Sequence, residues 1–144
     1  ALGEHGESQM VAWSAVTLGG KALAQLQKER PDSYGMLDPD AIAEEGKAGG
    51  WKILGGKGST EFGIAASIAE VVRAIFRDEN RILPVSVLLE GQYGQRDVYA
   101  SVPAVLNRDG IADIIELKLS PEEEEKFSAS CKTMSENYKL ALTL

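Results

Sequence analysis

The chain has 144 residues, of which 44% are apolar and 26% charged, a composition typical of a globular domain with one core. Its net charge of −7 argues against nucleic-acid binding, which needs clustered lysine and arginine, and no apolar run approaches the roughly 20 residues that cross a bilayer. The single cysteine, Cys131, excludes an intrachain disulfide and a thiolate metal cluster and predicts a reducing, cytoplasmic setting. Because Cys131 lies in a helical apolar stripe, we expect a core residue rather than a nucleophile.

The N-terminal part of the chain predicts short elements separated by glycine and proline. In chain order we expect a loop over 1–7, a half-buried extended segment over 10–18, a short helix over 21–27, and a second loop over 31–35.

A long helix is predicted to begin at Asp38, whose carboxylate is a good N-cap before Pro39 at the first helical position. Three glycines interrupt its pattern, and each costs about 1 kcal/mol relative to alanine. The helix is therefore either packed by its neighbours or broken at Gly46, Gly49 and Gly50. A further interruption is expected at Gly55, Gly56 and Gly58.

Thr60 is predicted to be the N-cap of the next long helix. The apolar residues after it recur at spacings of three and four, so they form one face that should be buried: Ile64, Ile68, Val71, Val72 and Ile75.

The C-terminal half predicts strands followed by one helix. Two β-rich runs, 83–89 and 97–106, are joined by a turn at 91–94, and a tight turn at 107–110 precedes a strand that alternates over 115–119. Residues 120–123 form a capping box that starts a helix with an apolar stripe of Phe127, Cys131, Met134, Tyr138 and Leu142. An antiparallel meander with long helices packed at its ends is an α+β fold.

His5 is the only histidine, and it is the one side chain here that gives or takes a proton near neutral pH without a large pKa shift. Gly3 and Gly6 allow the backbone to bend beside it. From spacing alone, an incidental histidine on a surface loop is the commoner interpretation, because no partner is positioned for it.

The segment Gly3-Glu4-His5-Gly6-Glu7-Ser8 resembles the active-site signature of the L-lactate and malate dehydrogenase family, in its C-terminal catalytic domain. Further blocks resemble the family in order and spacing: Gln9 to Ser14, Gly56 to Thr60 with Gly63-Ile64, Leu83 to Ser86, Gly91 to Gly94, Ser101 to Pro103, Asn107 to Ile111, and Leu119 to Glu124. One departure is Glu7, where the family usually has aspartate, which moves the carboxylate outward by roughly 1.5 Å.

The resemblance implies an NAD-dependent oxidoreductase acting on a small 2-hydroxy acid, with His5 as the proton donor and acceptor. It implies that Thr60 borders the small end of the substrate and favours lactate over malate. It also implies that Ile64 packs on the nicotinamide ring, although a plain core role fits Ile64 equally well. Trp13 and Trp51 are expected to be packing residues, and no metal site is expected at the acidic run 122–125, which complements the helix dipole.

Several elements that the family needs for cofactor binding and catalysis are not found in these residues. The sequence has no G-x-G-x-x-G turn of a Rossmann domain, and the family's substrate-clamping arginine, its histidine-orienting aspartate and its mobile loop would lie before Ala1. We therefore expect residues 1–144 to be the catalytic domain of a homodimeric or homotetrameric enzyme. By themselves they should have negligible activity, with NAD bound mainly by the other half.

Three alternatives stay open at this point. L-2-hydroxyisocaproate or malate dehydrogenase activity belongs to the same family, and the residues that separate these substrates lie largely in the mobile loop. A P-loop at 55–60 fits poorly, because Trp51 stands where the first glycine is required and Gly58 follows Lys57 in place of serine or threonine. A non-catalytic fragment that self-associates through exposed apolar surface is the alternative from a different class.

Overall fold

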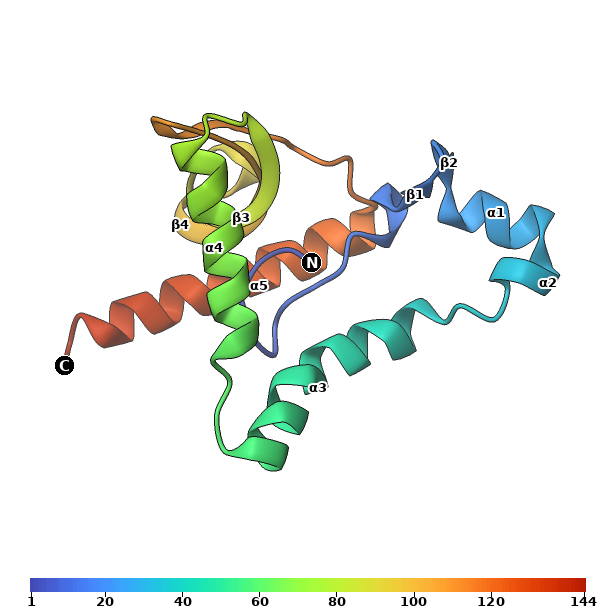
Figure 1. Ribbon diagram of the computed structural model, residues 1–144, viewed down its shortest axis with the longest axis horizontal. Coiled ribbons are helices and arrows are strands. Elements are labelled where there is room, and N and C mark those ends of the chain that lie inside the picture. Colours follow the sequence, from blue (N-terminus) through green and yellow to red (C-terminus); the bar gives the residue numbers. More distant parts are fainter.

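The computed structural model describes all 144 residues and has an α+β fold, as predicted (Figure 1). The N-terminal part contains η1 (Trp13–Ala15), β1 (Thr17–Leu18), β2 (Lys21–Ala22), α1 (Leu23–Glu29), α2 (Pro31–Tyr34) and α3 (Pro39–Lys57). The C-terminal part contains α4 (Phe62–Phe76), β3 (Arg81–Glu90), η2 (Gln92–Gly94), β4 (Arg96–Asn107), β5 (Gly110–Ile114) and α5 (Pro121–Ala141). In Figure 1, α1 to α3 extend away from the sheet, and α5 runs beneath it.

The main sheet is an antiparallel meander in the order β3-β4-β5. Strand β4 lies in the centre, and its residues alternate between the buried and the more exposed face, as a strand with one face on a core requires. The side chains of this strand that enter the core are Val98, Ala100, Val102, Ala104 and Leu106. The strands predicted over 83–89 and 97–106 and both predicted turns are confirmed in this region.

Helix α5 packs its N-terminal half against this sheet. Its predicted capping box is present, since the Ser120 hydroxyl accepts from the Glu123 amide and the Glu123 carboxylate accepts from the Ser120 amide. Phe127 and Cys131 are 1% and 2% exposed, which confirms the start of the predicted stripe. The end of the stripe was predicted wrongly: Tyr138 and Leu142 are 66% and 69% exposed, because α5 runs past the edge of the sheet.

Helix α3 begins as predicted, with the Asp38 carboxylate accepting from the amides of Asp40 and Ala41 at 3.0 and 3.2 Å. It is neither broken at its glycines nor packed by neighbours, because it runs unbroken to Lys57 and none of its residues is buried. The interruption predicted at Gly55 and Gly56 is also wrong. Only Gly58, with φ of +81°, ends the helix in the left-handed conformation.

Helix α4 differs from its prediction in two ways. Its N-cap is Glu61 and not Thr60, and no side chain caps it. Its apolar face is largely open, with Ile64, Ile68 and Val72 at 55%, 54% and 41% exposure, and only Ala74 is fully buried. The helix crosses the sheet with one end only, so most of its apolar face has no partner within the chain (Figure 1).

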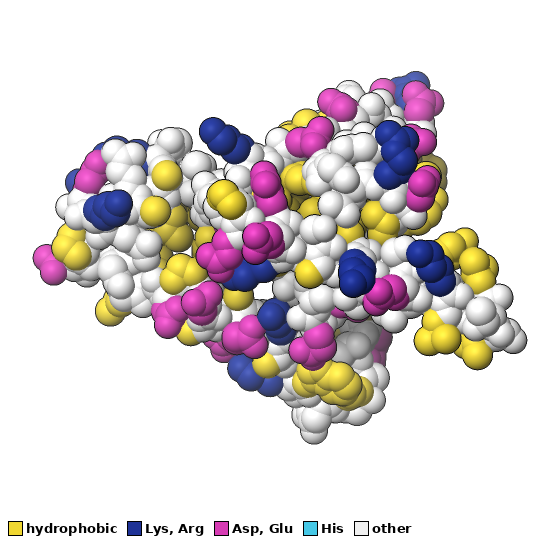
Figure 2. Space-filling view, turned by 180° about the vertical axis from the view of Figure 1, so that it is seen from behind, with side chains coloured by type: hydrophobic (Ala, Val, Ile, Leu, Met, Phe, Trp, Pro, Cys, Tyr) yellow, Lys and Arg dark blue, Asp and Glu magenta, His cyan; other side chains and the backbone are white.

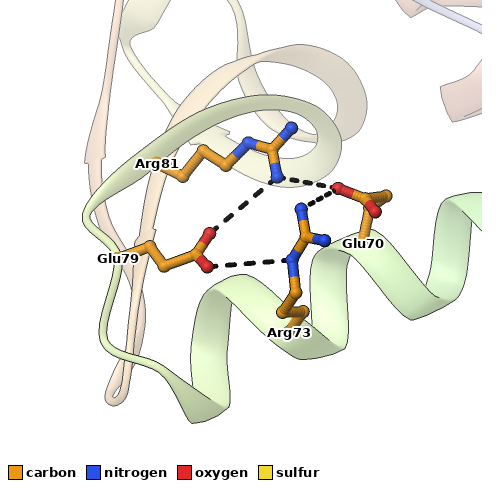
Figure 3. Close-up of polar contacts among 4 residues, drawn as sticks. All are labelled: Glu70, Arg73, Glu79 and Arg81. Carbon is orange, nitrogen blue, oxygen red and sulfur yellow. Dashed lines mark hydrogen bonds and ion pairs between the residues drawn. The ribbon is translucent and has the colours of Figure 1, made fainter.

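A four-residue ion-pair network fixes that end of α4 to the first residue of β3 (Figure 3). Arg81 lies 2.7 Å from the Glu70 carboxylate and 3.8 Å from that of Glu79. Arg73, which lies one turn after Glu70 on α4, pairs with the carboxylates of both Glu70 and Glu79. Because the four charges alternate around a ring, each cation has an anion on either side.

Three shorter segments also differ from their predictions. Residues 10–18 are not extended throughout, because the Ser14 amide and hydroxyl donate to Glu123 and curl the chain into η1. Of residues 31–35, which were predicted to be a loop, Pro31–Tyr34 form the helical turn α2, with Pro31 at its first position. Residues 115–119 keep the predicted alternation of burial but lack a strand, since β5 ends at Ile114.

Apolar side chains stay exposed over several elements. Figure 2 shows them gathered at the free end of α5 and where α3 meets α4. Those with at least half of their surface exposed on these elements include Trp51, Ile53, Phe62, Phe76, Tyr138, Leu140 and Leu142. No helix combines the length and the low charge of a membrane-spanning segment.

The buried carboxylate of Glu123 yields a first prediction. Burial raises its pKa, but the bonds that it accepts from the Ser120 amide and from Ser14 outweigh burial, so its pKa lies below the ordinary glutamate value. Glu123→Gln should lower the free energy of unfolding at neutral pH by about 1–3 kcal/mol, measured by urea denaturation, because bonds to a charged acceptor are lost.

The sign of the pH dependence follows from the lowered pKa. The stabilisation is present above the ordinary glutamate pKa and disappears as the pH falls through the lowered value of the folded state. The two proteins should therefore converge in stability at acid pH. Glu122→Gln is the matched control, because Glu122 lies in the same helical turn with its side chain 76% exposed. An equal loss in both variants would contradict the role of Glu123.

Candidate active site

The segment around His5 is attached to the open edge of β4. Strand β5 pairs with β4 only over residues 104–107, so β4 has free backbone groups further along. Gly3 takes this place, because its amide donates to the Ser101 carbonyl at 2.9 Å and its carbonyl accepts from the Ser101 amide at 3.0 Å. Leu2 and Met10 then pair with each other through bonds of 2.7 and 3.1 Å and close the loop that carries His5.

Helix α5 holds the same loop from the other side. The Glu4 amide donates to the Ser130 hydroxyl at 2.9 Å, and the two hydroxyls of Ser8 and Ser130 lie 3.1 Å apart. The Ser8 hydroxyl and amide both donate to the Glu4 carboxylate. These two bonds, the hydroxyl first, outweigh the small effect of burial and hold the pKa of Glu4 below its usual value.

Gly3 is required where the loop meets α5. It has a φ of +87°, and a Cβ at this position would lie 2.4 Å from the Ser130 hydroxyl oxygen. Glycine therefore serves two purposes at once here, the left-handed backbone and the close approach to the helix. The sequence predicts that Gly3 lets the backbone bend near His5, but it does not predict the contact of Gly3 with α5.

His5 itself is exposed and lines two adjoining hollows. The smaller one, of about 450 Å³, lies between the His5 loop and α3. The larger one, of about 750 Å³, lies between His5 and the start of α4. Thr60 lines both hollows, and Ile64 lines the larger one. The structure thus brings together all three residues singled out in the sequence, from three different segments.

Several lining residues were not predicted. Gly46 and Gly50 lie one helical turn apart and present the bare backbone of α3 to the smaller hollow. Trp51 lines this hollow with 68% of its surface exposed, so its predicted packing role is wrong. From the sequence, Gly46 and Gly50 count only as costs to the helix, and within the chain a Cβ on either glycine would meet no atom within 4 Å.

The charges around the hollows are mixed, and the lysines are paired. Lys47 lies 2.8 Å from Glu44, and Lys57 lies 2.9 Å from Glu61 with its ammonium 4.5 Å from the centre of the Phe62 ring. The only cysteine takes no part in the site. Burial raises the pKa of the Cys131 thiol to about 11, as expected for an unreactive core residue.

Comparison of the sequence with protein-family models identifies the domain. The family model for the lactate/malate dehydrogenase α/β C-terminal domain matches residues 1–144. The chain belongs to the lactate/malate dehydrogenase family.

Its relatives in this family include named L-lactate dehydrogenases. L-lactate dehydrogenase 3 of Bacillus cereus is 47% identical over 130 residues, which is 90% of the chain and 41% of that protein. L-lactate dehydrogenase 1 of Bifidobacterium longum is 42% identical over 136 residues, 94% of the chain and 43% of that protein. The chain therefore spans about two fifths of the length of these curated relatives.

Solved structures agree with the sequence comparison. The ligand-bound minor L-lactate dehydrogenase of Enterococcus mundtii superposes with a TM-score of 0.85 at 34% identity, covering 93% of the chain and 42% of that structure. A lactate dehydrogenase from a deep-sea metagenome gives the same TM-score at 35% identity, covering 96% of the chain and 44% of that structure. The family's fold is thus present in the chain as predicted.

The contact between Gly3 and Ser130 yields a second prediction. Gly3→Ala should destabilise the protein by the cost of left-handed backbone, about 1–2 kcal/mol, and by a further 1–3 kcal/mol or so from the collision with Ser130. Gly20→Ala separates the two effects, because Gly20 has a similar φ of +82° and open space around it. Equal losses of unfolding free energy in the two variants would show that the close approach to α5 costs nothing.

Proposed function

We propose that the enzyme containing this chain interconverts L-lactate and pyruvate, with NAD as the hydride carrier and His5 as the proton donor and acceptor. The observation that carries the proposal is the convergence of His5, Thr60 and Ile64 on adjoining hollows. The names of the relatives support the choice of reaction, because proteins up to 47% identical to the chain are L-lactate dehydrogenases.

The larger hollow suits one end of the proposed cofactor. Ile53, Phe62 and Ile64 line it with 50%, 75% and 55% of their surfaces exposed, and such apolar side chains can cover a flat nicotinamide ring. When bound, NAD supplies a carbon that accepts hydride from the lactate C2, and NADH returns it to pyruvate. The phosphates and adenosine would be held by the NAD-binding half of the enzyme.

The proton part of the reaction falls to His5. In lactate oxidation, neutral His5 accepts the proton of the lactate hydroxyl as the C–H bond breaks, so that no alkoxide has to persist. In pyruvate reduction, the imidazolium donates the same proton to the carbonyl oxygen. The loop that carries His5 is held by β4 and α5, which keeps the backbone next to His5 at a fixed place beside the hollows.

The position of Thr60 supports lactate as the substrate. It lines both hollows, so a substrate that reaches His5 would have its small end bordered by the threonine methyl and hydroxyl. A methyl group, as in lactate, leaves room there, whereas the carboxylate of malate or the branched chain of 2-hydroxyisocaproate needs more space. We therefore place lactate first among the acids that the family oxidises.

The exposed apolar faces support a larger assembly. Helices α3 and α4 and the end of α5 leave large apolar side chains uncovered. Surfaces of this kind are covered by a partner in stable proteins. We propose that the NAD-binding half and further copies of the enzyme cover them, in a cytoplasmic homodimer or homotetramer.

The decisive test is His5→Gln in the full-length enzyme, since glutamine keeps polar atoms but cannot exchange a proton near neutral pH. The kcat/KM for NADH-dependent pyruvate reduction should fall by about a hundredfold to ten-thousandfold. NADH binding, followed by fluorescence, should be unchanged. Full turnover by this variant would refute the proposed role of His5. The isolated 144-residue chain, assayed alongside, should show negligible activity.

Thr60→Ala tests the substrate class separately. Removing the hydroxyl and methyl should raise kcat/KM for oxaloacetate and 4-methyl-2-oxopentanoate relative to pyruvate by about tenfold or more, which is the usual worth of a group of this size in a pocket. Thr17→Ala is the control, because Thr17 is exposed on β1 and lines neither hollow. An unchanged ratio among the three 2-oxo acids would show that Thr60 does not border the substrate.

A further inference from the structure

We propose that Ser130 of α5 is a positioning residue for His5, acting through a closed ring of hydrogen bonds on Glu4 and Ser8. This inference rests on the proposed function, because it assigns the residue that holds the proposed proton donor in place. It concerns a side chain that lies 125 residues away from His5 in the sequence and lines neither hollow.

The ring begins and ends on the residue next to His5. The Glu4 amide donates to the Ser130 hydroxyl at 2.9 Å. The Ser130 and Ser8 hydroxyl oxygens lie 3.1 Å apart, and the Ser8 hydroxyl contacts the Glu4 carboxylate. The Ser8 amide adds a bond of 3.0 Å to the same carboxylate oxygen. Both the backbone and the side chain of Glu4 are therefore fixed.

The chemistry of the groups dictates the direction of every bond. An ionised carboxylate only accepts, so the Ser8 hydroxyl donates to Glu4. Having used its proton, the Ser8 oxygen can only accept from Ser130. The Ser130 oxygen in turn accepts from the Glu4 amide. Since each hydroxyl donates and accepts in one sense around the ring, the bonds strengthen one another.

Within residues 1–144, little other than this hydrogen-bond ring holds His5 in place. Its imidazole is exposed, and neither its ring nor its backbone takes part in a hydrogen bond within the chain. Ser130 is completely buried, in contrast, on a helix that is packed against β4. The hydrogen bonds among Ser130, Glu4 and Ser8 thus tie the backbone immediately before His5 to the rigid helix α5.

The size of the side chain at 130 is also constrained. Gly3 approaches so closely that even a Cβ on it would meet the Ser130 oxygen at 2.4 Å. Alanine at 130 would leave the Glu4 amide without its acceptor and the Ser8 oxygen without a donor. The loop would then be free to shift, and a displacement of about 1 Å of a catalytic group costs on the order of a hundredfold in rate.

The test compares Ser130→Ala, Ser8→Ala and the double variant in the full-length enzyme, with rates expressed per molecule competent to bind NADH. Ser130→Ala should lower kcat for pyruvate reduction by about tenfold to a hundredfold and leave KM nearly unchanged, since the chemistry and not the binding is disturbed. The double variant should be no slower than the slower single variant, because both substitutions break one ring. Ser128→Ala, exposed on the same helix, is the matched control and should behave as wild type.

A merely structural role would reduce the fraction of competent molecules and leave kcat per competent molecule intact, and that result would overturn the inference. Multiplicative losses in the double variant would also overturn it. If Ser130→Ala does not fold, Ser8→Ala carries the test, because Ser8 is only partly buried and should show the same loss in kcat. Loss of activity in His5→Gln together with an unaffected Ser130→Ala would refute this inference and leave the proposed function standing.

Discussion

One face of α5 organises both the core and the candidate active site. Glu123, Phe127 and Ser130 recur at spacings of four and three along the helix, so they lie on the same side and face inward. Phe127 packs in the core, while the two polar residues bind the N-terminal segment at separate points, Glu123 at Ser14 and Ser130 at Glu4. Burying the apolar residue therefore also buries the two polar contacts that fix the His5 segment.

This arrangement explains which parts of the fold could be predicted. The capping box, the N-cap at Asp38 and the β3–β4 hairpin depend on neighbours in the sequence, and local patterns identified them. The shape of residues 10–18 could not be predicted in this way. It depends on the bond from Ser14 to Glu123, which are separated by 109 positions. No pattern within the segment carries that information, because β-rich residues favour an extended chain until a distant carboxylate curls it.

The candidate site, like the fold, could be predicted from the sequence only in part. A short motif located His5, and the resemblance located Thr60 and Ile64, but only the folded chain shows that the three line adjoining hollows. Gly46 and Gly50 seemed in the sequence to be weak points of a helix. In the structure they make a bare surface beside His5, and the helix bears their cost without packing. Helix propensity predicts the cost of these glycines but not their position beside the hollow, which only the folded chain shows.

The exposure of α4 bears on the two roles that spacing left open for Ile64. An apolar face at helical spacing predicts that something covers it, but not what the cover is. Ile64 is 55% exposed and lines the same hollow as His5, so it is not a core residue of this chain. The core cluster is formed by residues of the N-terminal segment, β3, β4 and α5 together with Leu119, and no residue of α4 belongs to it. The exposed apolar face of α4 is therefore consistent with the proposed contact of Ile64 with a ligand or another domain, and it does not fit a core role for Ile64 within the chain.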